Sequence, residues 1–75
     1  MAQFFFDLKG GLPKRDHRGE ICATTGEAKV RADAMADRYS RMQPDLVGRG
    51  YYVALIDITG REIYQAPVKP LVATR

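Results

Sequence analysis

One helical segment, bounded at both ends, constrains the fold of this chain more than any other feature. Thr24-Thr25-Gly26-Glu27 fits a capping box, in which a threonine hydroxyl and the Glu27 carboxylate each accept a hydrogen bond from a backbone amide. Pro44 disfavours helical geometry at the residue before it and so ends the helix. The sequence predicts a helix from about Gly26 to about Gln43, capped by one of the two threonines.

The spacing of small and apolar residues predicts which side of this helix is buried. Wound at 100° per residue, a stripe about 120° wide contains Ala28, Ala32, Met35, Ala36, Tyr39 and Met42. A charged row at i,i+4 spacing forms a separate, solvated face, with Lys29, Asp33, Asp37 and Arg41. The three alanines of the stripe would allow the helix to lie close to a sheet. Ser40 falls on the polar side.

Short strand-like segments precede the helix. Gln3–Leu8 is rich in aromatic residues and alternates, with Phe4, Phe6 and Leu8 on one face and Phe5 and Asp7 on the other. Beyond a Gly-Gly turn, the chain is expected to return as a short strand through Lys14-Arg15. A further brief strand follows at Glu20-Ile21-Cys22.

The longest predicted strand follows the helix, at Tyr51–Ile58. It is apolar on both faces, which suits a central strand or a strand whose second face meets a partner. It pairs back onto a strand at Glu62–Val68. A three-residue loop would place Leu55 opposite Ile63 and a four-residue loop would place it opposite Tyr64, and the sequence leaves both registers open.

These elements define an α+β fold: a small antiparallel sheet of three to four strands with one helix packed across it, in the order ββ(β)αββ. The 75 residues form a single domain, 1–75, in which 69–75 is expected to be a loose tail. The predicted core is Phe4, Phe6, Ala32, Met35, Tyr39, Val53 and Leu55, with Leu46 and Val47 covering its end.

An Asp-x-x-Gly pattern that leads into Glu-Ile occurs twice, beginning at Asp16 and at Asp57. Aspartate suits the first position of a type I turn, and glycine supplies the left-handed conformation at its end. We interpret the two copies as hairpins that use the same turn chemistry. A duplicated ββ unit on either side of the helix is the alternative.

One helix covers one face of a sheet, so the second face is the first candidate for binding. The predicted interaction surface on that face is Phe5, Tyr52, Ile56 and Tyr64. Apolar patches of this kind on small domains usually mark contact sites, and we expect a homodimer. The alternative is that the loops at 9–19 and 44–50 fold over the bare face.

The formal net charge is only +3. The one basic cluster, a possible basic patch, contains Lys9, Lys14, Arg15 and Arg18. Such a cluster is either a solvated loop or a phosphate-binding surface, and aromatic residues on the strands could stack bases beside it. Nucleic-acid binding is therefore the second hypothesis.

Catalysis is the third and weakest hypothesis. The chain has one histidine (His17), one cysteine (Cys22) and one serine (Ser40). A Ser-His-Asp triad would require Ser40 to meet His17, yet Ser40 lies on the polar side of the predicted helix. We therefore expect a protein that is not an enzyme, with no catalytic residue, no cofactor and no metal ligands. A single cysteine forms no internal disulfide, and we expect a cytoplasmic protein without a membrane-spanning segment.

Two resemblances follow from the order of these motifs. The aromatic opening Phe4–Leu8, the turn Asp16–Gly19, the helix start Glu27-Ala28 and the hairpin Asp57–Arg61 resemble a family of short proteins of unknown function found in rhizobia and related alphaproteobacteria. This resemblance implies no activity or site residue.

A second, local resemblance involves the turn at Asp16–Gly19, Thr24 and the helix start at Glu27-Ala28. These residues are similar to the turn-strand-helix of HicB-like antitoxins, whose partial ribonuclease H-like domain binds a small toxin. The leading prediction is thus a protein of unknown function that acts as a non-enzymatic, homodimeric interaction module. The alternative is a regulatory nucleic-acid-binding or antitoxin-like protein.

Overall fold

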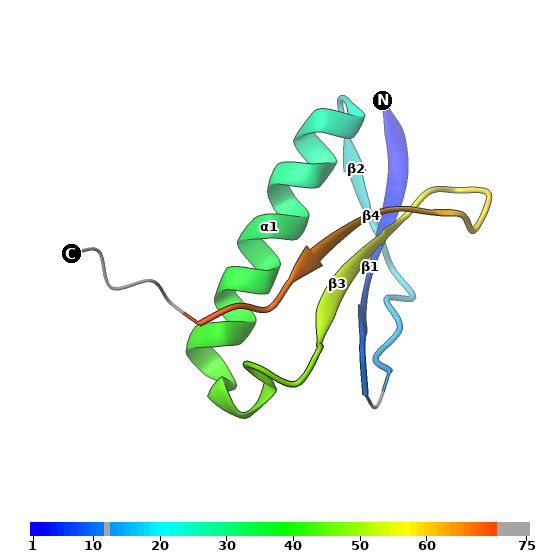
Figure 1. The fold of residues 1–75 in the computed structure, drawn as a ribbon. Helices are drawn as coiled ribbons and strands as arrows, with labels where there is room; N and C mark the ends of the chain where they lie inside the picture. Colours follow the sequence, from blue (N-terminus) through cyan, green and yellow to red (C-terminus); the bar gives the residue numbers. More distant parts are fainter. Residues whose placement is uncertain (12, 71–75) are drawn as a thin grey trace.

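The computed structural model of the chain describes residues 1–11 and 13–70. Four strands and one long helix follow one another in the order ββαββ (Figure 1). The elements are β1 (Ala2–Lys9), β2 (Glu20–Cys22), α1 (Thr25–Met42), the short 3-10 turn η1 (Pro44–Leu46), β3 (Tyr52–Ile56) and β4 (Glu62–Pro67). The predicted α+β class is confirmed. Of the tail predicted at 69–75, Lys69 and Pro70 follow β4 without regular secondary structure, and 71–75 lie outside the described residues.

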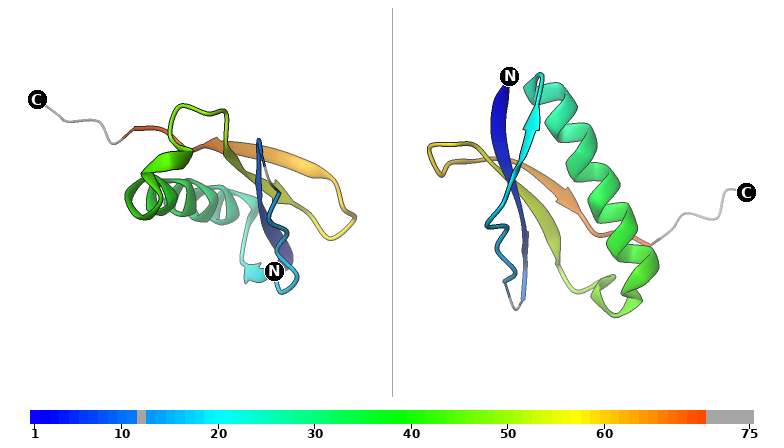
Figure 2. Two further views of the ribbon diagram at one scale, coloured as in Figure 1. Left: turned by 90° about the horizontal axis from the view of Figure 1, so that it is seen from below. Right: turned by 180° about the vertical axis from the view of Figure 1, so that it is seen from behind.

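The sheet has the strand order β2-β1-β3-β4, and all neighbouring strands are antiparallel. Because β2 and β3 both run antiparallel to β1, they are parallel to each other. Helix α1 connects them as a crossover that passes over β1. The helix therefore lies against one face of the twisted sheet, as Figure 2 shows. It packs mainly against β3 and β4.

The expected return strand at Lys14-Arg15 is reduced to a single bridge. The backbone amides and carbonyls of Leu8 and Lys14 bond each other at 2.9 Å in both directions. Pairing stops beyond this point because the Asp16 carboxylate, not a backbone carbonyl, accepts the next amide of β1, that of Phe6, at 3.1 Å.

The capping box at the start of α1 is confirmed, and Thr24 is the cap. Its Oγ1 accepts a hydrogen bond from the Glu27 amide at 3.0 Å, and the Glu27 Oε1 accepts one from the Ala23 amide at 2.7 Å. The helix ends where predicted, with the Gln43 amide bonded to the Tyr39 carbonyl and Pro44 next in the chain.

The predicted buried stripe is wrong at its C-terminal end. The residues of α1 that are fully covered are Ala28, Ala32, Ala36 and Ser40. Steps of four residues advance by 400°, so a line of small side chains at i,i+4 drifts 40° per step. Since the helix approaches the sheet along this line, Ser40 is buried with its hydroxyl donated to the Asp37 carbonyl at 2.6 Å, and Met42 is 73% exposed.

The core lies between α1 and the helix-facing side of the sheet. Phe4, Phe6, Val53 and Leu55 are buried there as predicted, whereas Met35 and Tyr39 are only half-buried at its margin. Leu46 and Val47 pack against the core, as expected.

Strand β3 is central, as its apolar faces predicted. In the hairpin that follows, Leu55 pairs with Tyr64, and a β-bulge shifts the register so that Ile56 pairs with Glu62. This is the pairing that the four-residue loop required.

Candidate functional site

The face of the sheet turned away from α1, here called the open face, has a polar half. Lys9 on β1 reaches across β3 to Glu62 on β4, with 3.1 Å between Nζ and Oε1. The Gln65 side-chain amide donates to the other Glu62 oxygen at 2.6 Å. Hydrogen bonds from Gln65 and Lys9 lower the pKa of Glu62, and the bond to Glu62 raises the pKa of Lys9. Ala54 of β3, which pairs with Gln65, is completely buried.

The other half of the open face is apolar. Phe5 pairs with Ile56 across β1 and β3, and these two side chains line a hollow of about 370 Å³ together with Ile58. We call these three residues the Phe5 patch. Ile58 is 70% exposed, and Ile21, which pairs with Gln3 on the same face, is 65% exposed.

The structure separates the four residues of the predicted interaction surface. Phe5 and Ile56 lie together, but Tyr52 lies at the polar end of the open face, opposite Lys9. Tyr64 lies on the other face of the sheet, because the β-bulge places it opposite Leu55. Its assignment to the bare face was wrong.

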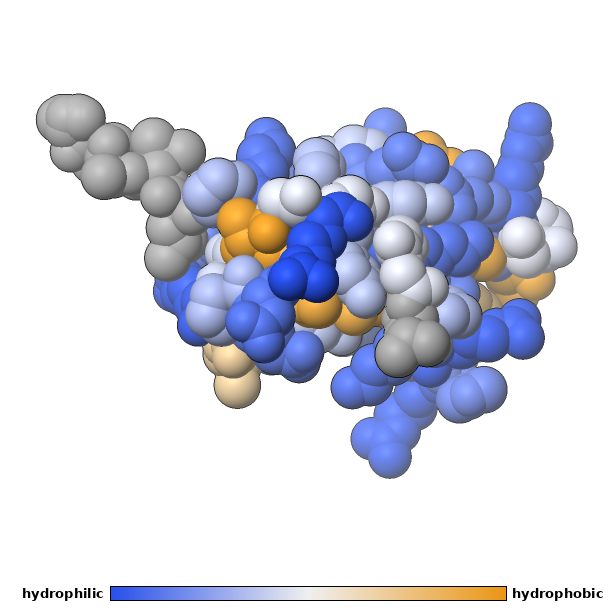
Figure 3. Space-filling view, turned by 60° about the horizontal axis from the view of Figure 1, so that its bottom comes forward, coloured by the Kyte–Doolittle hydropathy of each residue, from blue (hydrophilic) through white to orange (hydrophobic). Residues whose placement is uncertain are grey.

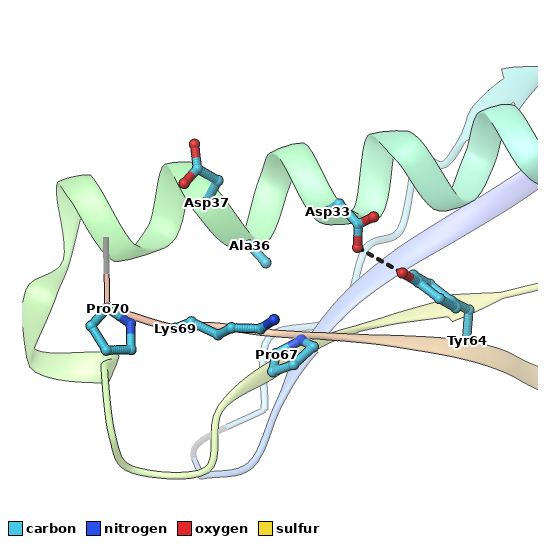
Figure 4. A pocket seen from close by; sticks show the side chains of 7 residues that line it. All are labelled: Asp33, Ala36, Asp37, Tyr64, Pro67, Lys69 and Pro70. Atoms are coloured by element: carbon cyan, nitrogen blue, oxygen red, sulfur yellow. Dashed lines mark hydrogen bonds between the residues drawn. The ribbon is translucent and has the colours of Figure 1, made fainter. Parts of the chain in front are cut away.

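Tyr64 instead takes part in the packing of α1 on β4. Its hydroxyl donates to Asp33 Oδ1 at 2.8 Å, which raises the pKa of Tyr64. The Lys29 ammonium lies 5.5 Å from the centre of its ring, within the range of a cation–π contact. Beside this pair, a cavity of about 540 Å³ extends towards Pro67, Lys69 and Pro70 (Figure 4).

The loops border the open face without covering the Phe5 patch. Arg15, Asp16 and His17 lie at the edge of the patch. Gly48 and Gly50 lie at the opposite end, beside Tyr52. Ile58 is 70% exposed, so the loops leave this part of the patch open, whereas Phe5 and Ile56 are half-buried.

Asp16 holds the loop at the edge of the sheet in place. Its carboxylate accepts hydrogen bonds from the amides of Phe6, Arg18 and Gly19 at 3.0–3.1 Å, and its own amide donates to Asp7 Oδ1 at 2.9 Å. Partial burial works to raise the pKa of Asp16, but the three amides outweigh it and the net shift is downward. These bonds hold the backbone of the loop around Asp16 against β1.

On the helix side of the sheet, the same loop forms one wall of a groove of about 620 Å³. Its apolar floor consists of Phe6, Met35 and Tyr39. We call this the basic groove because its rim carries Lys14, Arg15, His17 and Arg18. It exists because α1 packs mainly against β3 and β4, which leaves β1 less covered.

Three of the four residues of the predicted basic patch, Lys14, Arg15 and Arg18, therefore gather at this groove. Lys9 does not, because it lies on the open face in its ion pair with Glu62. The sequence did not reveal that Met35, Tyr39 and Arg38 of α1 lie beside this basic cluster. Their helical spacing was visible, but Met35 and Tyr39 had been assigned to the core.

The polar groups considered for catalysis are far from activated. Cys22 is 1% exposed, and burial raises the pKa of its thiol. The Ser40 hydroxyl is bonded to a backbone carbonyl of its own helix. Within residues 1–11 and 13–70, histidine, cysteine and acidic side chains form no cluster suited to a metal ion.

On the side of the molecule that Figure 3 shows, hydrophobic residues are visible as separate groups among hydrophilic ones. In the part of the chain that the structure describes, no helix has the combination of length and apolarity needed to cross a membrane.

The chain belongs to a protein family of unknown function. The model of the family described as Domain of unknown function (DUF6894) matches residues 3–69. This agrees with the predicted kinship to short proteins of unknown function, whereas the alphaproteobacterial origin and the likeness to HicB-like antitoxins stay predictions. No curated protein and no solved structure matches the chain.

Proposed function

We propose that this protein is a non-enzymatic interaction domain that forms a homodimer through the Phe5 patch. The observation that carries the proposal is the 70% exposure of Ile58 beside Phe5 and Ile56, on the sheet face that α1 does not cover. Contiguous apolar surface of this kind is costly in water and usually marks a contact site. Ile21 extends the apolar surface onto β2.

The groups at the edge of the patch make it self-complementary. Arg15 and Asp57, which carry opposite charges, both line the hollow. A two-fold axis that passes between them would bring Arg15 of one copy towards Asp57 of its partner and Asp57 towards the partner's Arg15, because contacts in an isologous interface occur twice. A second copy of the chain therefore fits both the apolar centre and the charged border.

The environments of the Cys22 thiol and the Ser40 hydroxyl support a role without catalysis. A thiol held neutral by burial is a poor nucleophile. The Ser40 hydroxyl donates its proton to the Asp37 carbonyl, which is not a general base. The buried single thiol of Cys22 is also compatible with the reducing cytoplasm, where we place the protein.

The proposal is tested by measuring mass in solution with light scattering at micromolar concentration. We expect about twice the chain mass of 8.4 kDa for the natural sequence. Ile58→Lys should give monomers, because a charge would then have to be buried at the centre of the interface. Val30→Lys is the matched control, since Val30 is 67% exposed on α1 and should leave the dimer intact.

A monomer at every concentration would contradict the proposal. So would a dimer that survives both Ile58→Lys and Ile21→Lys. The antitoxin-like alternative predicts instead a stable complex with a small toxin, and copurification of one chain of another sequence would favour it.

A further inference from the structure

The side of α1 that faces the basic groove carries an apolar stripe that the core covers only in part. Met35, Tyr39 and Met42 follow one another at i, i+4 and i+7, over a length of about 10 Å. Met42 is 73% exposed, and the other two are half-buried. A hollow of about 290 Å³, lined also by Arg38, continues the groove along this stripe.

The cations around the groove have no internal partners. In the described part of the chain, the ion pairs involve Lys9, Arg31 and Arg41 only. Those at the groove, which form none, are Lys14, Arg15, Arg18 and Arg38.

The two acidic groups at the groove are, by contrast, already engaged. Glu20 is paired with Arg31 at 2.7 Å. The Asp16 carboxylate accepts three backbone amides. Glu20 is thus offset by Arg31, whereas Asp16 keeps its negative charge. The unpaired cations at the groove, Lys14, Arg15, Arg18 and Arg38, outnumber it, and the rim has a net positive charge.

From this arrangement we infer that the basic groove binds an acidic amphipathic helix of a partner protein. Apolar side chains of that helix would lie on the stripe of Met35, Tyr39 and Met42, and its carboxylates would meet Arg18 and Arg38. Amphipathic helices bind grooves through anchors at i, i+3, i+4 and i+7, and methionine side chains adapt well to apolar anchors.

A nucleic acid fits the same groove less well. Bases stack on exposed aromatic rings, whereas Phe6 is only 7% exposed and Tyr39 is half-buried. The inference does not depend on the proposed homodimer, because Arg18, Arg38 and Met42 do not line the Phe5 patch.

The test uses a fluorescent synthetic peptide with leucines at helical spacing flanked by glutamates, and follows its anisotropy on titration with the whole protein. Arg18→Glu and Arg38→Glu should each weaken binding about tenfold, because each replaces an attraction by a repulsion at the rim. Arg49→Glu makes the same change of charge outside the groove and should alter binding less than about twofold.

Met42→Gln tests the apolar stripe and should weaken binding of the peptide about fivefold. Val30→Gln, its control on the outer side of α1, should leave binding unchanged.

Several results would overturn the inference. They are absence of binding at millimolar peptide, equal losses for Arg49→Glu and Arg18→Glu, and equal binding of a peptide with lysines in place of glutamates. Tighter binding of a single-stranded oligonucleotide, lost in the same arginine variants, would assign the groove to nucleic acid. Ile58→Lys should bind the peptide normally, so failure of the homodimer and failure of the groove are distinguishable.

Discussion

The turns at Asp16–Gly19 and Asp57–Gly60 begin from the same Asp-x-x-Gly pattern, and the fold uses them differently. In both, the aspartate Oδ1 accepts the amide two residues later. Asp57 finds all its partners within four residues, in Thr59 and Arg61. Asp16 also accepts the amide of Phe6, ten residues away on β1.

The difference shows how one local motif acquires a tertiary role. The Asp57 turn closes a hairpin whose two strands already pair, so it needs only local hydrogen bonds. The Asp16 turn lies at the edge of β1 where no strand continues, and its carboxylate satisfies an amide that would otherwise lack a partner. The Asp16 turn also holds the walls of both candidate surfaces, the Phe5 patch and the basic groove.

The largest expected difference between the turns is at their glycines. Gly19 has φ +73°, and a Cβ there would lie 2.7 Å from the Phe4 carbonyl oxygen and 3.0 Å from Phe5 Cε2. Gly19→Ala should therefore combine backbone strain with a steric clash and lower the free energy of unfolding by about 3 kcal/mol. Urea denaturation measures this loss, and a value below that of Gly60→Ala would invert the comparison.

The next difference is at the aspartates. Asp16→Asn removes one charged acceptor from three amides and should lower the free energy of unfolding by about 1–2 kcal/mol at pH 7. Asp57→Asn, which disturbs an exposed local turn, should cost less. Equal losses in urea denaturation would show that the long-range bond to Phe6 adds nothing.

The stability that the Asp16 carboxylate contributes should also depend on pH. The pKa of Asp16 lies below its ordinary value of 3.8 in the folded protein. Its stabilising contribution is therefore complete above pH 3.8 and is lost as the pH falls through the lowered folded value. The difference in stability between the natural protein and Asp16→Asn should shrink in this acidic range, and a constant difference would contradict the assignment.

The smallest effect is expected at Gly60. This glycine has φ +89° but no atom within 4 Å of the position of a Cβ. Gly60→Ala should cost only the strain of the left-handed conformation, about 1 kcal/mol. Thermal unfolding would detect a shift of a few degrees, whereas a loss as large as that of Gly19→Ala would mean that the hairpin turn has a tertiary contact after all.

Much of the fold was accessible from the sequence because its signals are local. The Thr24 cap, the end of α1 before Pro44, the alternation of β1 and the central position of β3 each depend on neighbouring residues or on simple periodicity. The face of Tyr64 was not accessible, because a single bulge changes which residue lies opposite Leu55. The burial of Ser40 was also missed. The predicted buried stripe extended from the alanines to Tyr39 and Met42, whereas the helix contacts the sheet along the i,i+4 line that ends at Ser40.

The candidate surfaces divide in the same way. The cluster of Lys14, Arg15 and Arg18 was visible as a run in the sequence, and so were Phe5 and Ile56 on the second face of the sheet. Ile21 and Ile58 were not recognised as exposed, and Arg38 was not linked to the basic loop. Such pairings depend on which strands become neighbours and on where the helix lies across them.

By itself, the sequence determined the helix and the four strands, though not the absence of a strand at Lys14-Arg15, together with the α+β class and the sidedness of β1. Caps, prolines and alternating side chains act over a few residues. The tertiary structure alone decided that Lys9 leaves the basic cluster for Glu62, that Asp16 replaces a strand at the edge of β1, and that Met42 faces solvent beside the groove. These outcomes depend on the strand order β2-β1-β3-β4 and on the position of α1 over β3 and β4. Contacts between residues distant in sequence form only where the packed elements bring them together.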